Sequence, residues 1–349
     1  MRVPFLLAPM AELSHRALRE LIEGFGPADE YFTEMISAGA FVNQGRFEAW
    51  YADNGPVPEK LVYQITGSDE DQLEKTLILL DQKECLGIDM NMGCSAHAIT
   101  RTGAGIRWMT DIDRAAALIR RLRSKTRRRL SVKLRTGLED NLEYLVKFCR
   151  RLQDEGLDLI TLHPRTARER FKRKAQWNHV FALRKELRIP VAGNGDIASA
   201  DEMLRRAEEC DAVMIGRLAV RQPWVFAEAK KSARTGEGVD EAMLNGDGPR
   251  ILLPFNDAFG PYEHQEQEKV TVTFFEETGL RFLELLARYQ PPEFHISRAR
   301  RFFGYFCDNL KWGTHVRNLI NREADIQGIE RVWKGYFKTT NRTDMGEGA

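Results

Sequence analysis

Residues 190–217 read PVAGNGDIASADEMLRRAEECDAVMIGR and contain one complete structural repeat. The stretch begins with a short apolar run at 190–193 and ends with a second one at 212–215, and both are short enough to be buried strands. Between them, residues 200–209 carry apolar side chains at helical spacing. Because parallel strands need a crossover connection, usually a helix, this order predicts a βαβ unit.

The same alternation recurs along the first 235 residues. Eight apolar runs are predicted to be strands, at Val3–Leu7, Glu30–Thr33, Leu61–Ile65, Gly87–Met90, Leu130–Leu134, Leu157–Leu162, Pro190–Gly193 and Ala212–Ile215. Helical patterns separate them, and only the stretch from Met35 to Lys60 lacks a clear helix. Eight such units over this length predict an α/β fold, a (β/α)8 TIM barrel. An open doubly wound sheet is less favoured because no GxGxxG follows the first strand.

The pattern changes after the eighth unit. Residues 1–235 are therefore assigned to the barrel domain, and residues 236–264, which are rich in Gly, Asp and Pro, to a linker or insertion. Amphipathic helical patterns return over 265–338, which predicts a C-terminal all-helical domain. The polar residues 339–349 are expected to form a disordered tail.

The composition is that of an ordinary soluble globular protein. The chain has 349 residues, 43% of them hydrophobic, and 52 Lys and Arg against 51 Asp and Glu. No apolar run is long enough to span a membrane and the N-terminus does not resemble a secretory signal, so we expect a cytoplasmic protein. The five cysteines form no CxxC pair, which argues against a disulfide framework and against a thiolate metal site.

Polar residues follow the predicted strands at the end where a TIM barrel holds its active site. Strand seven runs into Gly193-Asn194-Gly195-Asp196 and strand eight into Gly216-Arg217. Exposed backbone N–H groups beside an arginine are typical of a phosphate site. Each motif alone is weak, but their shared position predicts a phosphate-bearing ligand.

Three further side chains point to the heteroatom edge of a flavin or a nucleobase. Lys133 alternates with the apolar residues of its strand and is predicted to face the barrel interior, where an unpaired ammonium is costly. It therefore needs an electron-rich ligand, or an internal ion pair with Asp89 or Glu34. Gln64 and His163 face the same cavity, where they either bind a ligand or are satisfied core groups.

Cys94 is the candidate with chemical reactivity. It follows Gly93 in a loop after strand four, whereas Cys85, Cys149 and Cys210 read as small buried hydrophobes. The thiol can serve as a nucleophile or as a general acid. No Cys-His-Asp pattern is evident, although His97 lies three residues further on.

Taken together, these residues resemble the tRNA-dihydrouridine synthases, a family of FMN-dependent reductases of uridine in tRNA. The resemblance extends over nearly the whole chain. It rests on Ala8-Pro9-Met10, Phe32-Thr33-Glu34-Met35, Gln64 before Gly67-Ser68-Asp69, Asp89-Met90-Asn91-Met92-Gly93-Cys94, Lys133-Leu134-Arg135-Thr136-Gly137, His163 with Arg165-Thr166, Ala175 with Trp177, Gly193-Asn194-Gly195-Asp196-Ile197 and Val213-Met214-Ile215-Gly216-Arg217. Residues 299–305, ARRFFGY, resemble part of the helical domain of the family.

The resemblance implies a cofactor, an electron donor and a mechanism. NADPH would reduce FMN, the flavin N5 would pass a hydride to uracil C6, and Cys94 would donate a proton to C5 while Asn91 positions the base. The implied FMN contacts are Pro9, Met10, Ala11, Gln64, Lys133, His163, Asn194, Gly195, Asp196, Gly216 and Arg217. We expect no metal.

Two residues depart from the family pattern in the loop that carries the acid. The family usually has Pro directly after the cysteine and Lys four residues after it, where this chain has Ser95 and Ala98. Two alternatives therefore stay open: a catalytically impaired RNA-binding member of the family, and a flavin-dependent reductase of a small pyrimidine or enone.

Positive charge is concentrated in windows that suit an RNA partner. Residues 101–135 carry a net +10, residues 163–188 a net +7 and residues 298–338 a net +5, although the whole chain carries only +1. Because a uridine must leave its stack to be reduced, we expect the protein to hold the surrounding phosphates of a tRNA. The candidate RNA contacts are Asn91, Arg135, Arg165, Arg168, Arg170, Lys172, Arg300 and Arg301. We expect a monomer.

Overall fold

The computed structural model describes residues 3–169, 172–235 and 264–343. Residues 236–263 of the predicted linker at 236–264, and residues 344–349 of the predicted tail at 339–349, lie outside the described residues. Contacts divide the chain into two units. The first contains the residues up to His15 together with Ala28–Gly216, and the second contains Arg16–Pro27 and the chain from Arg217 onward.

The first unit is a closed barrel of parallel strands. Its eight barrel strands are β1 (Phe5–Leu7), β2 (Glu30–Phe32), β4 (Leu61–Thr66), β5 (Gly87–Met92), β6 (Arg129–Gly137), β7 (Leu159–Thr166), β8 (Val191–Asn194) and β9 (Ala212–Ile215). Each pairs in parallel with the next, β2 pairs with β4, and β9 closes the ring on β1. The predicted TIM barrel is therefore confirmed, with a short extra strand β3 (Ile36–Ser37) beside β4.

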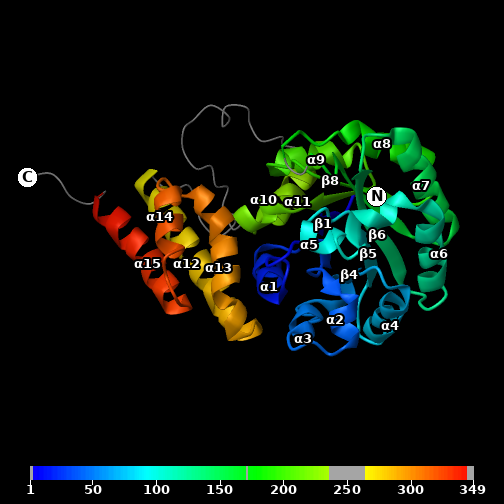
Figure 1. Ribbon diagram of the computed structural model, residues 1–349. Helices are drawn as coiled ribbons and strands as arrows, with labels where there is room; N and C mark the ends of the chain where they lie inside the picture. The colour runs from blue at the N-terminus through cyan, green and yellow to red at the C-terminus, as the bar shows by residue number, and fades with distance from the viewer. Residues whose placement is uncertain (1–2, 170–171, 236–263, 344–349) are drawn as a thin grey trace, which may run out of the picture. The chain divides into compact units, whose positions relative to one another are not determined.

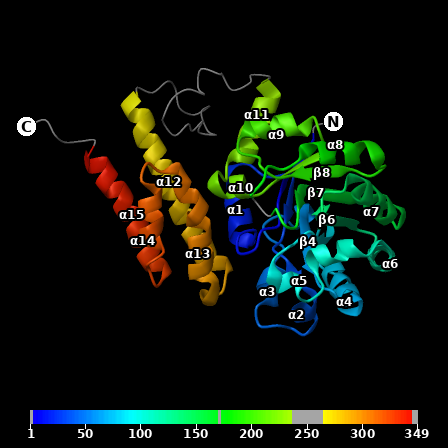
Figure 2. The same ribbon diagram turned by 45° about the horizontal axis from the view of Figure 1, so that its top comes forward.

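Helices surround the strands, as Figure 1 and Figure 2 show for α4, α6, α7 and α8. In this unit they are α2 (Ala38–Val42), α3 (Glu48–Tyr51), α4 (Glu70–Asp81), α5 (His97–Thr100), α6 (Ile112–Arg123), α7 (Leu142–Asp154), α8 (Trp177–Glu186) and α9 (Ala200–Ala207). Four of them begin where a short polar side chain accepts a hydrogen bond from the backbone N–H three residues further on. These N-caps are Asp69, Asp111, Asn141 and Ser199.

The second unit is helical in its described part. It contains α1 (Arg16–Phe25), α10 (Arg217–Arg221), α11 (Val225–Thr235), α12 (His264–Tyr289), α13 (Pro292–Phe306), α14 (Gly313–Ile320) and α15 (Ile326–Thr343). Its core is aromatic: Phe302 stacks on Phe282 with ring centroids 3.7 Å apart, and Trp333 packs on Phe303. Phe282, Phe302, Phe303, Phe306 and Trp333 are therefore core residues rather than exposed stacking surfaces, whereas Trp312 is exposed.

The barrel interior has two layers. The lower layer, toward the N-terminal ends of the strands, is apolar, and the upper layer, toward their C-terminal ends, is polar. Alternate residues of the strands point inward, so that Leu6, Phe32, Val62 and Met214 share one buried cluster. Near the N-terminal ends of the strands, the Arg129 guanidinium donates two hydrogen bonds to Glu30, at 2.7 and 2.6 Å. The inward residues nearer the C-terminal ends are polar, and the candidate site is built from them.

Strand β7 runs four residues beyond the predicted one, through Pro164. Proline normally argues against a continuing strand because it cannot donate to the ladder. Here the pairing with β6 is irregular between Arg135 and Gly137, and this irregularity accommodates the proline. His163 and Arg165 thus lie within a strand instead of in a loop after it.

Gly193 of β8 faces the ring of Trp177, and this close packing predicts a large effect of an added methyl group. In Gly193→Ala the new Cβ would lie 2.2 Å from Trp177 Cζ3. We expect a loss of about 1–3 kcal/mol in the free energy of unfolding, measured by urea denaturation. Gly304→Ala on α13 is the control, since no heavy atom lies within 4 Å of its added Cβ, and it should stabilise the helix by about 0.5–1 kcal/mol. Equal stability of the two variants would contradict the packing argument.

Candidate active site

Hydrogen bonds connect four polar side chains in the upper layer of the barrel. Ser131 Oγ donates to Asp89 Oδ1 at 2.6 Å, and Gln64 Nε2 donates to Asp89 Oδ2 at 2.7 Å. Asn91 Nδ2 donates to Gln64 Oε1 at 2.9 Å. We call Ser131, Asp89, Gln64 and Asn91 the polar relay. All four are buried, so their positions are tightly constrained.

The relay ends on the loop that carries Cys94. Asn91 Oδ1 accepts the backbone N–H groups of Gly93 at 3.3 Å and Cys94 at 3.0 Å. The carbonyl of Cys94 accepts the N–H of Ile106 at 3.0 Å. The backbone of Cys94 is therefore held on both sides without the proline that the family usually places after it.

Cys94 differs from the other cysteines in its exposure. It is half-buried, whereas Cys85, Cys149, Cys210 and Cys307 are buried and all five are free thiols. Burial raises the pKa of Cys210 to about 11 and that of Cys307 to about 12. These thiols stay protonated and inaccessible, and Cys94 is the one open to a substrate.

Lys133 lies beside the relay, and its charge is not neutralised by an ion pair. Burial lowers the pKa of Lys133 to about 8, and the positive charge of Arg135 acts in the same direction. Asp89 attracts the ammonium electrostatically, but no hydrogen bond or ion pair within 4.0 Å holds Lys133 among the described residues. The alternative of an internal ion pair with Asp89 or Glu34 is thus not what the structure shows.

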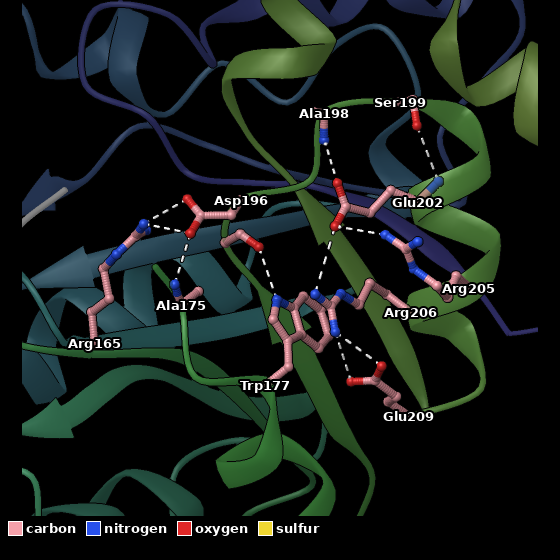
Figure 3. Close-up of polar contacts among 11 residues, drawn as sticks. Arg165, Ala175, Trp177, Asp196, Ala198, Ser199, Glu202, Arg205, Arg206 and Glu209 are labelled. Carbon is pink, nitrogen blue, oxygen red and sulfur yellow. Dashed lines mark hydrogen bonds and ion pairs between the residues drawn. The ribbon is translucent and has the colours of Figure 1, made fainter. Parts of the chain in front are cut away.

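Arg165 and Asp196 form the best-defined ion pair of the mouth, drawn in Figure 3. Arg165 Nη2 lies 2.6 and 2.5 Å from the two carboxylate oxygens of Asp196, and Ala175 N donates to the same carboxylate at 2.7 Å. Arg165 Nη1 also lies 3.0 Å from His163 Nε2. Since a guanidinium can only donate, that nitrogen of His163 accepts, and the ring proton sits on Nδ1.

The turn after β8 has an unusual backbone. Gly195 has a φ of +124° and Asp196 a φ of +54°, both in the left-handed region. A Cβ at position 195 would lie 2.9 Å from His163 Cδ2, so only glycine fits there. Trp177 Nε1 donates to Gly195 O at 3.0 Å, and the Arg206 guanidinium lies 4.6 Å from the centroid of the Trp177 ring, as Figure 3 shows. The hydrogen bond from Trp177, whose ring packs on Arg206, therefore holds the turn in place.

The remaining predicted residues are divided between the two units of the chain. Pro9 and Met10 are half-buried and Ala11 is exposed, in the turn after β1, while Asn194 Nδ2 ties β8 to β9 by donating to Met214 O. Gly216 is the last residue of the first unit, and a Cβ added there would lie 3.5 Å from Met10 Sδ, an ordinary van der Waals distance. Arg217 begins α10, and Arg300 and Arg301 lie on α13, all three in the second unit.

The candidate RNA contacts differ in exposure. Arg135 and Arg165 are buried, and burial together with the positive charge of Arg165 lowers the pKa of Arg135. Arg168 and Lys172 are exposed on the loop after β7, and Arg170 lies outside the described residues. The exposed pair suits contact with a polyanion, whereas the buried pair lies within the mouth.

The sequence does not single out Ser131 as part of the site, and it suggests Asp89 only as an ion-pair partner of Lys133. Both lie on the inward face of their strands, two residues apart from Asn91 and Lys133 respectively. The alternation of side chains along a strand carries that signal, since a polar residue in an otherwise apolar strand needs a partner inside the barrel.

The fold and the site define a TIM-barrel protein whose chemistry lies at the barrel mouth. Residues 6–244 match the dihydrouridine synthase (Dus) family. The chain is 31% identical over 259 residues to the probable tRNA-dihydrouridine synthase of Aquifex aeolicus, covering 68% of this chain and 76% of that protein. It is 26% identical over 334 residues to tRNA-dihydrouridine synthase B of Xanthomonas axonopodis pv. citri, covering 95% and 92% respectively.

The chain therefore belongs to the dihydrouridine synthase family, a family of tRNA-modifying oxidoreductases. The predictions of this family and of an enzyme are confirmed. The solved structure of a FabK mutant from Thermotoga maritima is similar over 64% of each chain, at 14% identity and with a TM-score of 0.39. Among the described residues, no helix is long and apolar enough to cross a membrane, and no three His, Cys, Asp or Glu side chains are grouped to hold a metal ion.

The buried carboxylate of Asp89 predicts a pH-dependent stability. Burial raises its pKa from 3.8 to about 6, so the folded protein binds this proton more tightly than the unfolded chain. The stabilisation from the protonated form is present at low pH and is lost as the pH rises through about 6. Asp89→Asn should therefore be more stable than wild type at pH 7, by up to about 3 kcal/mol. Urea denaturation at several pH values measures this gain, which should shrink toward pH 4; a pH-independent difference would contradict it.

Proposed function

We propose that the protein reduces uridine to 5,6-dihydrouridine in tRNA, with bound FMN as the cofactor and NADPH as the electron donor. The observation that carries the proposal is the ammonium of Lys133, which lies in the barrel mouth near Cys94 without an ion-pair partner among the described residues. A charge in that position favours an electron-rich ligand edge. Membership of the family supports the same cofactor and substrate.

The residues present fit FMN. Lys133, Gln64 and His163 would hold the polar edge of the ring. The backbone of Asn194, Gly195 and Gly216 would hold the phosphate. The carboxylate of Asp196 is bonded to Arg165, so Asp196 would hold the phosphate through its backbone while its side chain supports this turn. When bound, FMN supplies a hydride to the substrate.

The protein's own groups would then orient the base and move one proton. Cys94 would donate its thiol proton to C5 of the uracil, where negative charge is neutralised. Asn91 would position the base through its remaining N–H, because its oxygen is engaged by the Cys94 loop. Lys133 would stabilise negative charge on the ring edge it contacts.

Exposed cations on the loop after β7 support a tRNA substrate. Arg168, Lys172, Arg173 and Lys174 are all exposed, and this loop follows the strand that carries His163 and therefore lies at the mouth. Phosphate contacts of this kind add affinity without reading sequence, and they fit an enzyme that extrudes a base from a folded RNA.

The role of Cys94 is tested by Cys94→Ala in the purified protein. We expect the variant to keep its FMN and to lose about 10²- to 10⁴-fold in the rate of dihydrouridine formation on a tRNA transcript, because the proton donor is gone. His97→Ala is the control, since His97 is exposed at the start of α5, three residues after Cys94, and should leave the rate unchanged. A Cys94→Ala enzyme as fast as wild type would exclude the acid role.

The role of the exposed loop is tested by charge reversal. Arg168→Glu with Lys172→Glu should weaken tRNA binding and reduce the slope of log Kd against log salt by about 1.4–1.8, since two phosphate contacts are lost. Lys125→Glu with Arg127→Glu is the matched control, which also reverses two charges: both residues are exposed but lie just before β6, at the opposite end of the barrel. Equal losses in both variants, measured by fluorescence anisotropy, would show that the loop contributes only its net charge.

A further inference from the structure

Two hydrogen bonds fix the backbone on either side of Cys94. Its N–H donates to Asn91 Oδ1 at 3.0 Å, and its carbonyl oxygen accepts the N–H of Ile106 at 3.0 Å. Because each peptide group is planar, these bonds hold the two peptide planes that flank the Cα of Cys94. The backbone dihedrals of Cys94 are then set, and the thiol keeps only the staggered positions of χ1.

The bond from Ile106 requires a glycine at position 105. Gly105 has a φ of +63°, in the left-handed region, and a Cβ added there would lie 2.4 Å from the carbonyl oxygen of Cys94. The same Cβ would lie 3.0 Å from Ile99 Cγ2. The carbonyl of Cys94 therefore occupies the space that a side chain at position 105 would need, and one of the two residues would have to move.

The segment that contains Gly105 is held more firmly than the Cys94 loop. Gly105 begins the 3₁₀ helix η2 (Gly105–Thr110). Three side chains of this helix are buried in the core: Ile106, Trp108 and Met109. The Trp108 ring also donates to Gly67 O at 2.8 Å. Cys94, in contrast, is half-buried at the mouth, so a clash between the two segments would displace Cys94 and not the packed helix.

We propose that Gly105 is a positioning residue for the Cys94 thiol: because it carries no side chain, η2 can bond the carbonyl of Cys94 and so set the direction in which the thiol points. This inference rests on the proposed function, in which that thiol protonates C5 of the uracil. A general acid must reach the atom that it protonates in a defined geometry. A displacement of about 1 Å can cost about 10²-fold in rate.

Gly105→Ala tests this role, and Gly103→Ala is its matched control. Gly105 and Gly103 both have a positive φ, +63° and +82° respectively, so alanine strains the backbone at either position. Among the described residues, a Cβ at position 103 would come within 4 Å of Ser68 alone, at 3.3 Å from its Cβ. Both variants should lower the midpoint of urea denaturation, and they differ in the contact with Cys94.

The first readout is the rate at which iodoacetamide labels Cys94, which needs no turnover. Labelling should be selective, because the other four cysteines are buried. In Gly105→Ala the bond from Ile106 to the Cys94 carbonyl is lost, and the loop opens more often. Labelling should therefore be about 3- to 10-fold faster than in wild type, the factor that one hydrogen bond contributes to an equilibrium. Gly103→Ala should label at the wild-type rate.

The second readout is the reduction of a tRNA transcript by the FMN-loaded protein. Gly105→Ala should lower kcat by about 10- to 10²-fold, because the proton donor is misplaced. The KM for tRNA should stay close to that of wild type, since the displaced group transfers a proton and does not bind the RNA. Gly103→Ala should keep the wild-type kcat, which separates positioning of the thiol from a general loss of stability.

Where Gly105→Ala fails to fold, Gly105→Asn replaces it with Gly103→Asn as its control, because asparagine tolerates a positive φ better than alanine and carries the same Cβ. A folded variant at position 105 that labels at the wild-type rate overturns the proposal. An equal change in the control at position 103 also overturns it, because backbone strain alone would then explain both. If wild type reduces no transcript, the proposed function fails, and the labelling rates still decide whether Gly105 positions Cys94.

Discussion

The ammonium of Lys133 inside the barrel is the charge that the rest of the site is arranged around. A buried ammonium is costly unless something electron-rich compensates it. Asp89 reduces that cost from a distance, and it is itself engaged by Ser131 and Gln64. The pKa of Lys133, at about 8, therefore lies close to neutral pH. The positive charge that remains at the barrel mouth favours binding of an electron-rich ligand.

The fold makes this possible by separating its layers. Apolar residues such as Leu6, Phe32 and Val62 fill the lower interior, and the ion pair of Arg129 with Glu30 lies near the N-terminal ends of the strands. The upper interior can then be polar, since most of its groups are bonded to one another in the relay and in the Arg165–Asp196 pair. In TIM barrels generally, residues at the N-terminal ends of the strands stabilise the fold, and residues at the C-terminal ends form the active site.

Much of this could be predicted from the sequence. The eight strands follow from runs of apolar residues, and helices begin at Asp69, Asp111 and Asn141 because short polar side chains cap them. The mouth residues follow from their positions at strand ends. These signals are local, so each can be read from a few neighbouring residues.

The pairings inside the site could not be predicted in this way. That Arg165 bonds Asp196, and that Asn91 bonds Gln64, depends on the register between strands that are far apart in the sequence. The continuation of β7 through Pro164 depends on an irregularity in β6, and the grouping of α1 with the C-terminal helices depends on tertiary contacts. The charge of Arg165 suggests an RNA contact, whereas the structure buries this side chain against a carboxylate.

The proposed activity of this chain is the formation of dihydrouridine in tRNA. It is tested by mapping dihydrouridine by position in tRNA from cells with the gene, without it, and with the gene restored. At least one position should lose dihydrouridine on deletion and regain it on restoration. Dihydrouridine that persists at every position in the deleted cells, together with a purified protein that reduces no tRNA transcript, would contradict the proposed activity.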